Sequence, residues 1–474
     1  MSDPDPREQK EILDLAREEA ERYLDALPDE PVRTQRADEA ALAFDGPLPE
    51  EGVGGPAAIR ELLEGTDALI RSSGPRFFHW VIGGTTPAAM GADWLTSAYD
   101  QNAGAWDSSP RSARLERVAV GWLRDLFGLP QSWGGVLTTG ATMANFAGLA
   151  CARSWWAERH GVDVDVEGLG ELPPVPVFSS GYVHPSATKA LAMMGIGRER
   201  VKRLARDDAG RLDLGALERE LVGLGGQPAI VIGNAGEVNT GDFDPIAAMA
   251  DLCEEHGAWL HVDGAFGLFA AVSPRSAHLV SGIERAHSVI SDGHKWLNVP
   301  HDTGFAFLKD PSRLGRVFSV AAAYLPGPDE ERPVFFNLGP ESSRRARSLA
   351  VWATLRAYGR EGYRRIVERH LDLAQRVARY VDEAPDFELL ADVPLNIVCF
   401  RYRPQDAPED ELNELNERIG RDVMADGRLY VGTTTFEGKA AFRPALVNWR
   451  TAEDDVDLIA NVIRELGERA RASA

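Results

Sequence analysis

Short apolar runs alternate with helical stretches along the middle of the chain. Six apolar runs predict strands near residues 175–179, 201–204, 229–233, 258–263, 287–291 and 303–308. Helical stretches lie between most of them, for example residues 187–194, 214–224 and 245–256. Strands separated by helices in this way predict an α/β fold with a mostly parallel sheet covered on both faces. In such sheets, ligands bind beyond the carboxyl ends of the strands.

The two ends of the chain predict further units. Residues 6–27 predict an amphipathic helix, and no nearby segment supplies an obvious core for its apolar face, so we expect that face to pack on another subunit. A Pro/Gly-rich linker follows at 46–56. Residues 344–383 predict a long helix, followed by strands near 396–402, 429–433 and 441–448 and helices near 409–425 and 453–471. We expect an N-terminal helical segment (1–75), a large domain (76–343) and a small C-terminal α+β domain (344–474).

Composition excludes several classes of protein. The net charge of −22 argues against binding to nucleic acid or to an anionic membrane. The three cysteines, Cys151, Cys253 and Cys399, are far apart, so neither a disulfide framework nor a metal cluster is expected. The N-terminus lacks an apolar targeting segment, and no apolar run approaches membrane-spanning length. We therefore expect a cytoplasmic protein without a metal site.

The most informative chemical feature is Lys295, in the string Ser291-Asp292-Gly293-His294-Lys295-Trp296. The chain has only six lysines but 45 arginines. Asp263 ends an apolar run and lies 32 residues before Lys295. An amine nucleophile and a strand-end carboxylate are what pyridoxal phosphate (PLP) chemistry needs, because the lysine forms a Schiff base and the carboxylate keeps the pyridine nitrogen protonated. Lys189 is the rival lysine. A surface lysine after a strand is the alternative interpretation of Lys295.

Three further segments offer contacts for such a cofactor. Residues 134–145 run from a strand through small residues into a helix, so Ala141 and Thr142 are expected to bind a phosphate at the helix N-terminus. A dinucleotide fingerprint is absent there. His184 either stacks on the pyridine ring or caps the next helix. Asn239 or Thr240 has a hydrogen-bonding group for the ring hydroxyl, whereas Asp244-Pro245 is expected to cap a helix.

In this order, the motifs resemble those of the group II PLP-dependent amino-acid decarboxylases, which include the aromatic-L-amino-acid and glutamate decarboxylases of fold type I. The motifs are Thr139–Asn145, His184, Gly236–Pro245, His261–Ala265 and Asp292–Lys295. The resemblance extends over residues 70–465, through Arg76-Phe77-Phe78, Trp106, Arg344–Leu349 and Phe442-Arg443. It implies a PLP-dependent decarboxylase that acts on an L-amino acid as a homodimer with shared active sites.

The resemblance also implies roles for individual residues. Lys295 is expected to carry PLP, with Asp263 at the ring nitrogen and His184 stacked on the ring. The remaining cofactor contacts are expected from Ala141, Thr142, Asn239, Ala265, Asp292 and His294. Trp80, Ile82 and Trp106 match positions that line the substrate pocket at the dimer interface. The family's Asp-Ala-Ala is Asp263-Gly264-Ala265 here, and its Asn-Pro before His-Lys is Asp292-Gly293.

A departure at Phe335 leaves the product open. Counting back from Arg344 without gaps, the family's catalytic loop tyrosine, the proposed acid for the carbon that loses carbon dioxide, falls at Phe335 in the expected substrate pocket. Phenylalanine has no proton to give, and in plant members this exchange accompanies aldehyde formation. Alternatively, Phe335 anchors an apolar loop, while Tyr324 or another group is the acid.

We therefore expect decarboxylation of an L-amino acid, with the aromatic amino acids among the candidates, to the amine and carbon dioxide. An aldehyde synthase is one alternative. An aminotransferase is another, with Arg443 as the carboxylate clamp that such enzymes use. The remaining possibilities are a non-catalytic PLP-fold protein and a binding protein without PLP.

Overall fold

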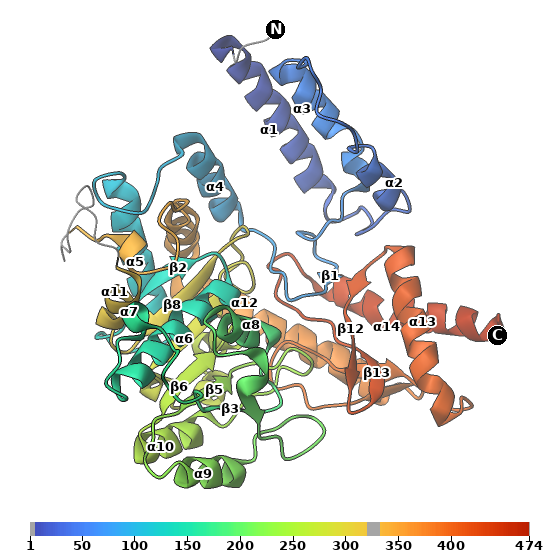
Figure 1. The fold of residues 1–474 in the computed structure, drawn as a ribbon. Coiled ribbons are helices and arrows are strands. Elements are labelled where there is room, and N and C mark those ends of the chain that lie inside the picture. Colours follow the sequence, from blue (N-terminus) through green and yellow to red (C-terminus); the bar gives the residue numbers. More distant parts are fainter. Residues whose placement is uncertain (1–4, 320–331, 474) are drawn as a thin grey trace.

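The computed structural model describes residues 5–319 and 332–473, and its largest unit is built around a seven-stranded sheet (Figure 1). In spatial order the strands are β2 (Gly134–Thr138), β8 (Gly304–Leu308), β7 (Ser288–Asp292), β6 (Trp259–Asp263), β5 (Ile230–Asn234), β3 (Val177–Ser179) and β4 (Val201–Arg203). β8 pairs antiparallel with both of its neighbours, whereas the pairs from β7 to β4 are parallel. The predicted α/β class with a mostly parallel sheet is confirmed.

Side chains of the sheet alternate between two hydrophobic cores, because successive residues of a strand point to opposite faces. In β5, Ile230 and Ile232 belong to one core and Val231 to the other. The first core includes residues of α6 (Ala141–Glu158), α7 (Val164–Glu167), α8 (Pro185–Met193) and α11 (Ser312–Phe318). The second core includes residues of α5 (Pro110–Leu126), α9 (Leu214–Gly223) and α10 (Ile246–His256). Burial on both faces explains the uninterrupted apolar runs in the sequence.

The carboxyl ends of the parallel strands meet at one edge of this sheet. Asp263 is the last residue of β6 and Asp292 the last of β7. At the same edge, β2 leads into α6 and β3 leads into α8, with His184 directly before α8. The sheet therefore brings the predicted site residues together from segments more than 100 residues apart.

The C-terminal region forms a smaller α+β unit, as predicted. Its antiparallel sheet has the order β12 (Thr433–Phe436), β13 (Lys439–Phe442), β10 (Phe400–Tyr402) and β9 (Phe387–Leu389), with α13 (Leu412–Asp426) and α14 (Glu453–Ala472). The long helix α12 (Ser348–Glu383) reaches it from the large unit and breaks at Gly359, where φ is 59°. β1 (Phe77–Phe78) pairs in parallel with β11 (Tyr430–Val431), so the start of the predicted large domain joins the small one. The predicted domain boundaries remain predictions.

The N-terminal segment projects away from the rest of the chain (Figure 1). It consists of α1 (Gln9–Ala26), α2 (Ala37–Leu42) and α3 (Gly55–Leu63), and α4 (Pro87–Tyr99) follows after β1. The predicted helix at 6–27 is confirmed as α1. The nearby α3 covers part of it, whereas Ala16, Ala20 and Tyr23 of the predicted apolar face line an open groove, so the packing of this face on another subunit stays a prediction. α3 packs so closely against α1 that a Cβ atom at Gly55 would lie 2.8 Å from Ile12 Cδ1.

Two local predictions are wrong. Asp244 does not cap α10, because its carboxylate instead accepts hydrogen bonds from the Asn234 N–H at 2.8 Å and from Ser180 Oγ at 2.9 Å. The helix predicted from residue 344 begins at Ser348, since Arg344 turns inward to pair with a buried carboxylate. None of the helices in residues 5–319 and 332–473 combines the length and apolar character that crossing a membrane requires.

The buried ion pair of Arg344 joins three segments of the large unit. Arg344 Nη2 lies 2.7 Å from Glu116 Oε1 on α5, and both side chains are 2% exposed. Arg344 also donates to the carbonyls of Ala103 and Leu137, and Glu116 accepts from the Leu137 N–H. Every charge is therefore paired, which burial requires.

Glu116→Gln is predicted to lower the free energy of unfolding by about 3–5 kcal/mol, because it leaves the buried guanidinium without its counter-charge. Urea denaturation measures this. Asp457→Asn, which breaks the surface pair of Asp457 with Arg376 at 2.7 Å, is the matched control and should cost less than about 1 kcal/mol. Equal effects of the two substitutions would contradict the prediction.

Candidate active site

A buried carboxylate connects Lys295 to the start of α6. Lys295 Nζ lies 3.4 Å from Asp292 Oδ2, and the Ala141 N–H donates to Asp292 Oδ1 at 2.6 Å. The Asp292 side chain is 4% exposed, and burial raises its pKa, an effect that the nearby Lys295 opposes. The structure thus brings together Lys295, Asp292 and Ala141, as the sequence predicted.

His294 and Thr142 complete this end of the site. The His294 ring stacks on His301 with ring centroids 4.3 Å apart, and burial lowers the pKa of His294 to about 4, so it is neutral at pH 7. Gly140 precedes α6 with a φ of 101°, and a Cβ atom there would lie 3.4 Å from His294. A glycine at this position therefore leaves the helix start open. The half-buried Thr142 is the second residue of that helix.

Asp263 lies at the other end of the site, at the carboxyl end of β6. The Ala265 N–H donates to Asp263 Oδ1 at 3.1 Å, and Asn145 Nδ2 donates to Asp263 Oδ2 at 2.9 Å. The carboxylate is nearly buried, with 6% of the residue exposed. Two donors on separate oxygens stabilise its negative charge and set its orientation.

His184 lies between these groups and the protein surface. Its Nδ1 accepts from the Ser186 N–H at 3.2 Å, so His184 caps α8, and it also contacts Ser186 Oγ at 2.7 Å. The capping interpretation of His184 is therefore confirmed. Burial lowers the pKa of His184, against the opposing charge of Asp263. A neutral imidazole is suited to lie against an aromatic ring.

The loop after β1 passes directly over Lys295. The Gly83 N–H donates to the His294 carbonyl at 3.0 Å, and a Cβ atom at Gly83 would overlap the Lys295 carbonyl oxygen. Trp80 and Ile82 belong to this loop. Trp80 is 62% exposed, and Ile82 packs beside β1. The structure thus places Gly83 of this loop against the Lys295 backbone, whereas Ile82 packs with Val32, Phe77 and Tyr430, and the Trp80 ring lies 4.3 Å from that of His79.

The other two predicted pocket residues lie in a different cluster. Phe335 is 3% exposed and its ring lies 5.4 Å from the Arg344 guanidinium carbon, in the core that also contacts Trp106. Phe335 begins the short helix η7 (Phe335–Asn337), and the Phe336 N–H donates to the Gly104 carbonyl at 2.9 Å. The buried ring supports the interpretation that Phe335 anchors its segment. Tyr324 lies outside the described residues.

Asn239 connects the large unit to the small domain. Asn239 Nδ2 donates to Glu237 Oε1 at 2.6 Å, and Thr434 Oγ1 of β12 donates to Asn239 Oδ1 at 2.8 Å. Glu237 also accepts from Thr240, through both the N–H at 2.9 Å and Oγ1 at 3.2 Å. Arg443, the candidate clamp, donates to the Val238 carbonyl at 3.2 Å. The polar groups of Asn239 and Thr240 are thus bonded within the protein.

Sequence reasoning missed the side chains behind Asp263. Asn145 on α6, His261 on β6 and Ser288 on β7 form a buried chain of hydrogen bonds that ends at Asp263. In the sequence, Asn145 was recognised only as the last residue of the segment 134–145, which was expected to bind a phosphate. The sequence did contain one indication of this chain. His261 and Asp263 are two residues apart on a strand, so their side chains lie on the same face of the sheet.

The site fits PLP at both ends. The first turn of α6 and the Thr142 hydroxyl supply donors for a phosphate, and Gly140 keeps that helix start accessible. The single proton of the neutral His294 is on Nδ1, which donates to the Thr303 carbonyl at 3.2 Å, so His294 lies beside this end as a neutral ring and not as a donor. Lys295 supplies the amine for a covalent bond. Asp263 supplies a carboxylate for the pyridine nitrogen, with both of its oxygens already oriented by donors. These donor types match the two charged ends of the cofactor.

Known proteins with related sequences and structures identify the family. Residues 65–403 match the pyridoxal-dependent decarboxylase conserved domain. An aromatic-L-amino-acid decarboxylase from Bacillus atrophaeus is 30% identical over 408 residues, which cover 84% of this chain and 82% of the relative. An L-2,4-diaminobutyrate decarboxylase from Acinetobacter baumannii is 28% identical, covering 79% of this chain and 76% of the relative.

Solved structures agree in fold. The structure of mouse CSAD has a TM-score of 0.89 at 25% identity and covers 98% of this chain and 99% of its own. The structure of Oryza sativa TDC with PLP and tryptamine has a TM-score of 0.90 at 22% identity and covers 99% of both chains. The chain therefore belongs to the pyridoxal-dependent decarboxylase family, as a PLP-dependent carboxy-lyase of the amino-acid decarboxylases.

Proposed function

We propose that this enzyme removes carbon dioxide from an L-amino acid with an aromatic or bulky apolar side chain and releases the amine. The observation that carries the proposal is the shared sheet edge, where Lys295 and Asp292 lie beside the start of α6 and Asp263 lies at the end of the neighbouring strand. Bound PLP supplies a ring that accepts the electron pair left by the departing carboxylate.

The protein's own groups then have distinct tasks. Lys295 would hold the cofactor through its amine. Asp263, oriented by Asn145 and the Ala265 N–H, holds a proton on the ring nitrogen. His184 would lie against the ring face, and Thr142 with the first turn of α6 would hold the phosphate, beside Ala141 and His294. Asp292 orients Lys295 across 3.4 Å.

Arg443 supports decarboxylation rather than transamination. One of its donors is bonded to the Val238 carbonyl, and the negative charge of Glu237 acts on the guanidinium. A strong bidentate arginine clamp would stabilise the substrate carboxylate in the ground state and so slow its loss. An arginine that is already shared within the protein avoids that penalty.

The side chain of the substrate is proposed from the loop over Lys295. Trp80 in this loop offers an exposed aromatic surface, and Ile82 is an apolar residue of the same loop. The Bacillus atrophaeus relative carries the name of an aromatic-L-amino-acid decarboxylase. A screen of the twenty amino acids, with carbon dioxide, amine, aldehyde and peroxide all measured, tests both the reaction and the substrate class.

Covalent attachment of PLP is predicted at Lys295. Borohydride reduction of the holoenzyme followed by peptide mapping should place the pyridoxyl label there. Lys295→Ala should abolish the label, whereas Lys189→Ala, on the solvent-exposed side of α8, should keep it. A label on Lys189 in the wild-type enzyme would sink the assignment.

Amine is the predicted product for both wild type and Phe335→Tyr. The Phe335 ring is buried under Arg344, so a hydroxyl added to it meets core atoms and not the reacting carbon. We expect no peroxide from either protein, and a destabilisation of about 1–3 kcal/mol in the variant from overpacking. Aldehyde and peroxide from wild type, replaced by amine in Phe335→Tyr, would establish the aldehyde synthase instead.

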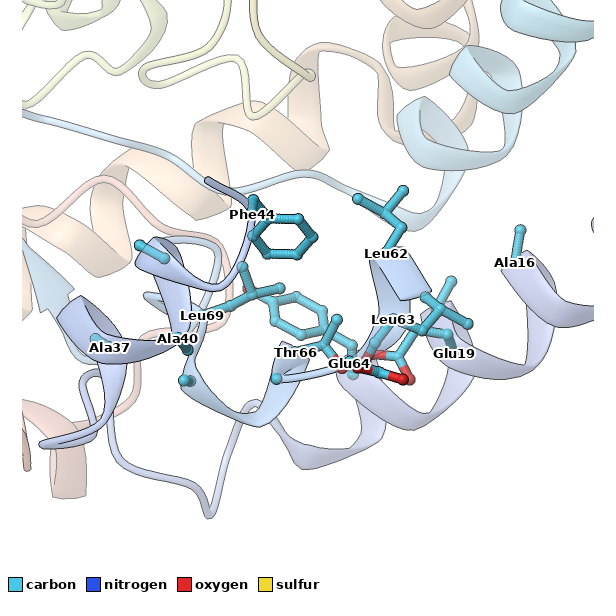
Figure 2. Close-up of a pocket in the computed structure, with 15 residues that line it drawn as sticks. Ala16, Glu19, Ala37, Ala40, Phe44, Leu62, Leu63, Glu64, Thr66 and Leu69 are labelled. Atoms are coloured by element: carbon cyan, nitrogen blue, oxygen red, sulfur yellow. Dashed lines mark hydrogen bonds between the residues drawn. The ribbon is translucent and has the colours of Figure 1, made fainter. Parts of the chain in front are cut away.

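We further propose a cytoplasmic homodimer whose subunits share the two active sites. An open groove of about 500 Å³ lies between the helices of the N-terminal segment, and Figure 2 shows Phe44, Leu62 and Leu69 along it. Phe44 is 59% and Leu62 58% exposed in the single chain. A second copy that covers this groove would remove the Phe44 and Leu62 side chains from water.

Leu62→Glu is predicted to shift the protein from dimer to monomer, since it places a charge in the groove. Sedimentation velocity at several concentrations measures the change, and we expect PLP-dependent activity to fall with the dimer. Leu48→Glu is the control, because Leu48 is 92% exposed and lies outside the groove. A wild-type monomer, or an unchanged Leu62→Glu dimer, would count against the proposal.

A further inference from the structure

We propose that Asn145 is a positioning residue that orients both Asp263 and His184 for the cofactor ring. This inference rests on the proposed function, in which those two side chains contact PLP. Asn145 lies near the start of α6, and none of its surface is exposed. Its amide nitrogen donates to Asp263 Oδ2 at 2.9 Å and to Ser186 Oγ at 3.1 Å. One amide group is therefore bonded directly to Asp263 and, through Ser186, to His184.

The direction of every hydrogen bond behind Asn145 is determined by chemistry. The Trp259 indole can only donate, and it does so to Ser288 Oγ at 3.0 Å. Ser288 Oγ could accept a second hydrogen bond, so the direction of its contact with His261 Nδ1, at 2.8 Å, is set from the other end of the chain. The Asp263 carboxylate only accepts, so Asn145 turns its amide nitrogen toward Asp263 and its oxygen toward His261 Nε2, and Nδ1 is left to accept the Ser288 proton. Burial lowers the pKa of His261 to about 4, so its neutral ring carries a proton on Nε2 and donates to Asn145 Oδ1 at 2.8 Å. The chain of donors therefore points toward Asp263.

The same chain prevents rotation of the Asn145 amide. If the amide were flipped, its oxygen would face the carboxylate of Asp263 and its nitrogen would face the donating Nε2 of His261. One contact would then pair two hydrogen-bond acceptors and the other would pair two donors. Both pairings are costly in a buried site, where water cannot satisfy these groups. The carboxylate on one side and the imidazole on the other thus hold the amide in a single orientation.

The other branch from Asn145 reaches His184. Ser186 Oγ accepts from Asn145, which leaves its own proton for His184 Nδ1 at 2.7 Å. The Ser186 N–H donates to the same nitrogen at 3.2 Å. With Nδ1 as an acceptor, a neutral His184 carries its proton on Nε2. The Ser186 N–H alone sets this tautomer, and Asn145, by donating to Ser186 Oγ, directs the hydroxyl proton to the same nitrogen and so helps to orient the His184 ring.

The packing of α6 on the sheet makes room for this arrangement. His261 and Asp263 share one face of β6, and Ser288 is the register partner of His261 on β7. Gly148, one turn after Asn145, faces the His261 ring, and a Cβ atom at Gly148 would lie 2.8 Å from His261 Cε1. A glycine inside a helix is unfavourable compared with alanine, and here it admits the imidazole.

The test is PLP binding by full-length Asn145→Leu, which keeps the approximate volume and removes the amide. We expect the PLP dissociation constant of the apo-protein to rise about tenfold or more, because a buried carboxylate loses a charged hydrogen bond. The absorbance spectrum of the bound cofactor should also change. A wild-type dissociation constant together with a wild-type spectrum would overturn the proposal.

Two further variants separate positioning from folding. Asn416→Leu removes a buried asparagine that bonds to the backbone of Tyr402 in the small domain, so it should lower the melting temperature and leave PLP binding unchanged. Ser186→Ala changes only the His184 branch at a partly exposed site and should weaken PLP binding about three- to tenfold. Should Asn145→Leu fail to fold, wild-type PLP binding by Ser186→Ala would overturn the proposal.

Asp263→Ala and His184→Ala, assayed in parallel, separate this inference from the proposed function. Wild-type PLP binding by both of these variants would contradict the proposal that Asp263 and His184 contact the cofactor ring. Weak binding by both, with unchanged binding by Asn145→Leu, would refute the role of Asn145 alone. Weak binding by all three supports the inference.

Discussion

The negative charge of Asp263, buried at the carboxyl end of β6, is the constraint on which the site geometry depends. A buried carboxylate is costly unless donors satisfy it. Here one donor comes from the loop after β6 and the other from Asn145 on α6. Satisfying that charge thus determines where α6 crosses the sheet. Because Asn145 is also bonded to the buried His261, the helix has little freedom to shift.

The position of α6 sets the length of the site. Its first residue, Ala141, donates to Asp292, the carboxylate beside Lys295, while its fifth residue, Asn145, donates to Asp263. One rigid helix thus contacts the carboxylates at both ends. The remaining walls come from elsewhere: the Gly83 loop covers Lys295, and Thr434 of the small domain bonds to Asn239. The site therefore requires the large unit and the small domain to be assembled.

The sequence predicted the parts of this architecture that depend on local pattern. Buried strands leave continuous apolar runs, so β5, β6 and β7 were placed to within about two residues, and with them Asp263 and Lys295. The network behind Asp263 was not predicted, because Asn145, Ser186 and Ser288 meet only when α6 and α8 cross the sheet. Asp244 and Arg344 were misjudged for a related reason. Each looked like a local helix signal, yet each is bonded to a distant segment.

The central claim is that Asp263, held by Asn145, keeps a proton on the pyridine nitrogen of PLP. The most direct measurement is nitrogen NMR of the enzyme reconstituted with PLP labelled with ¹⁵N at the ring. The account predicts the chemical shift of a protonated pyridine in wild type, and its loss in Asp263→Asn. An unprotonated ring nitrogen in the wild-type enzyme at neutral pH would contradict it.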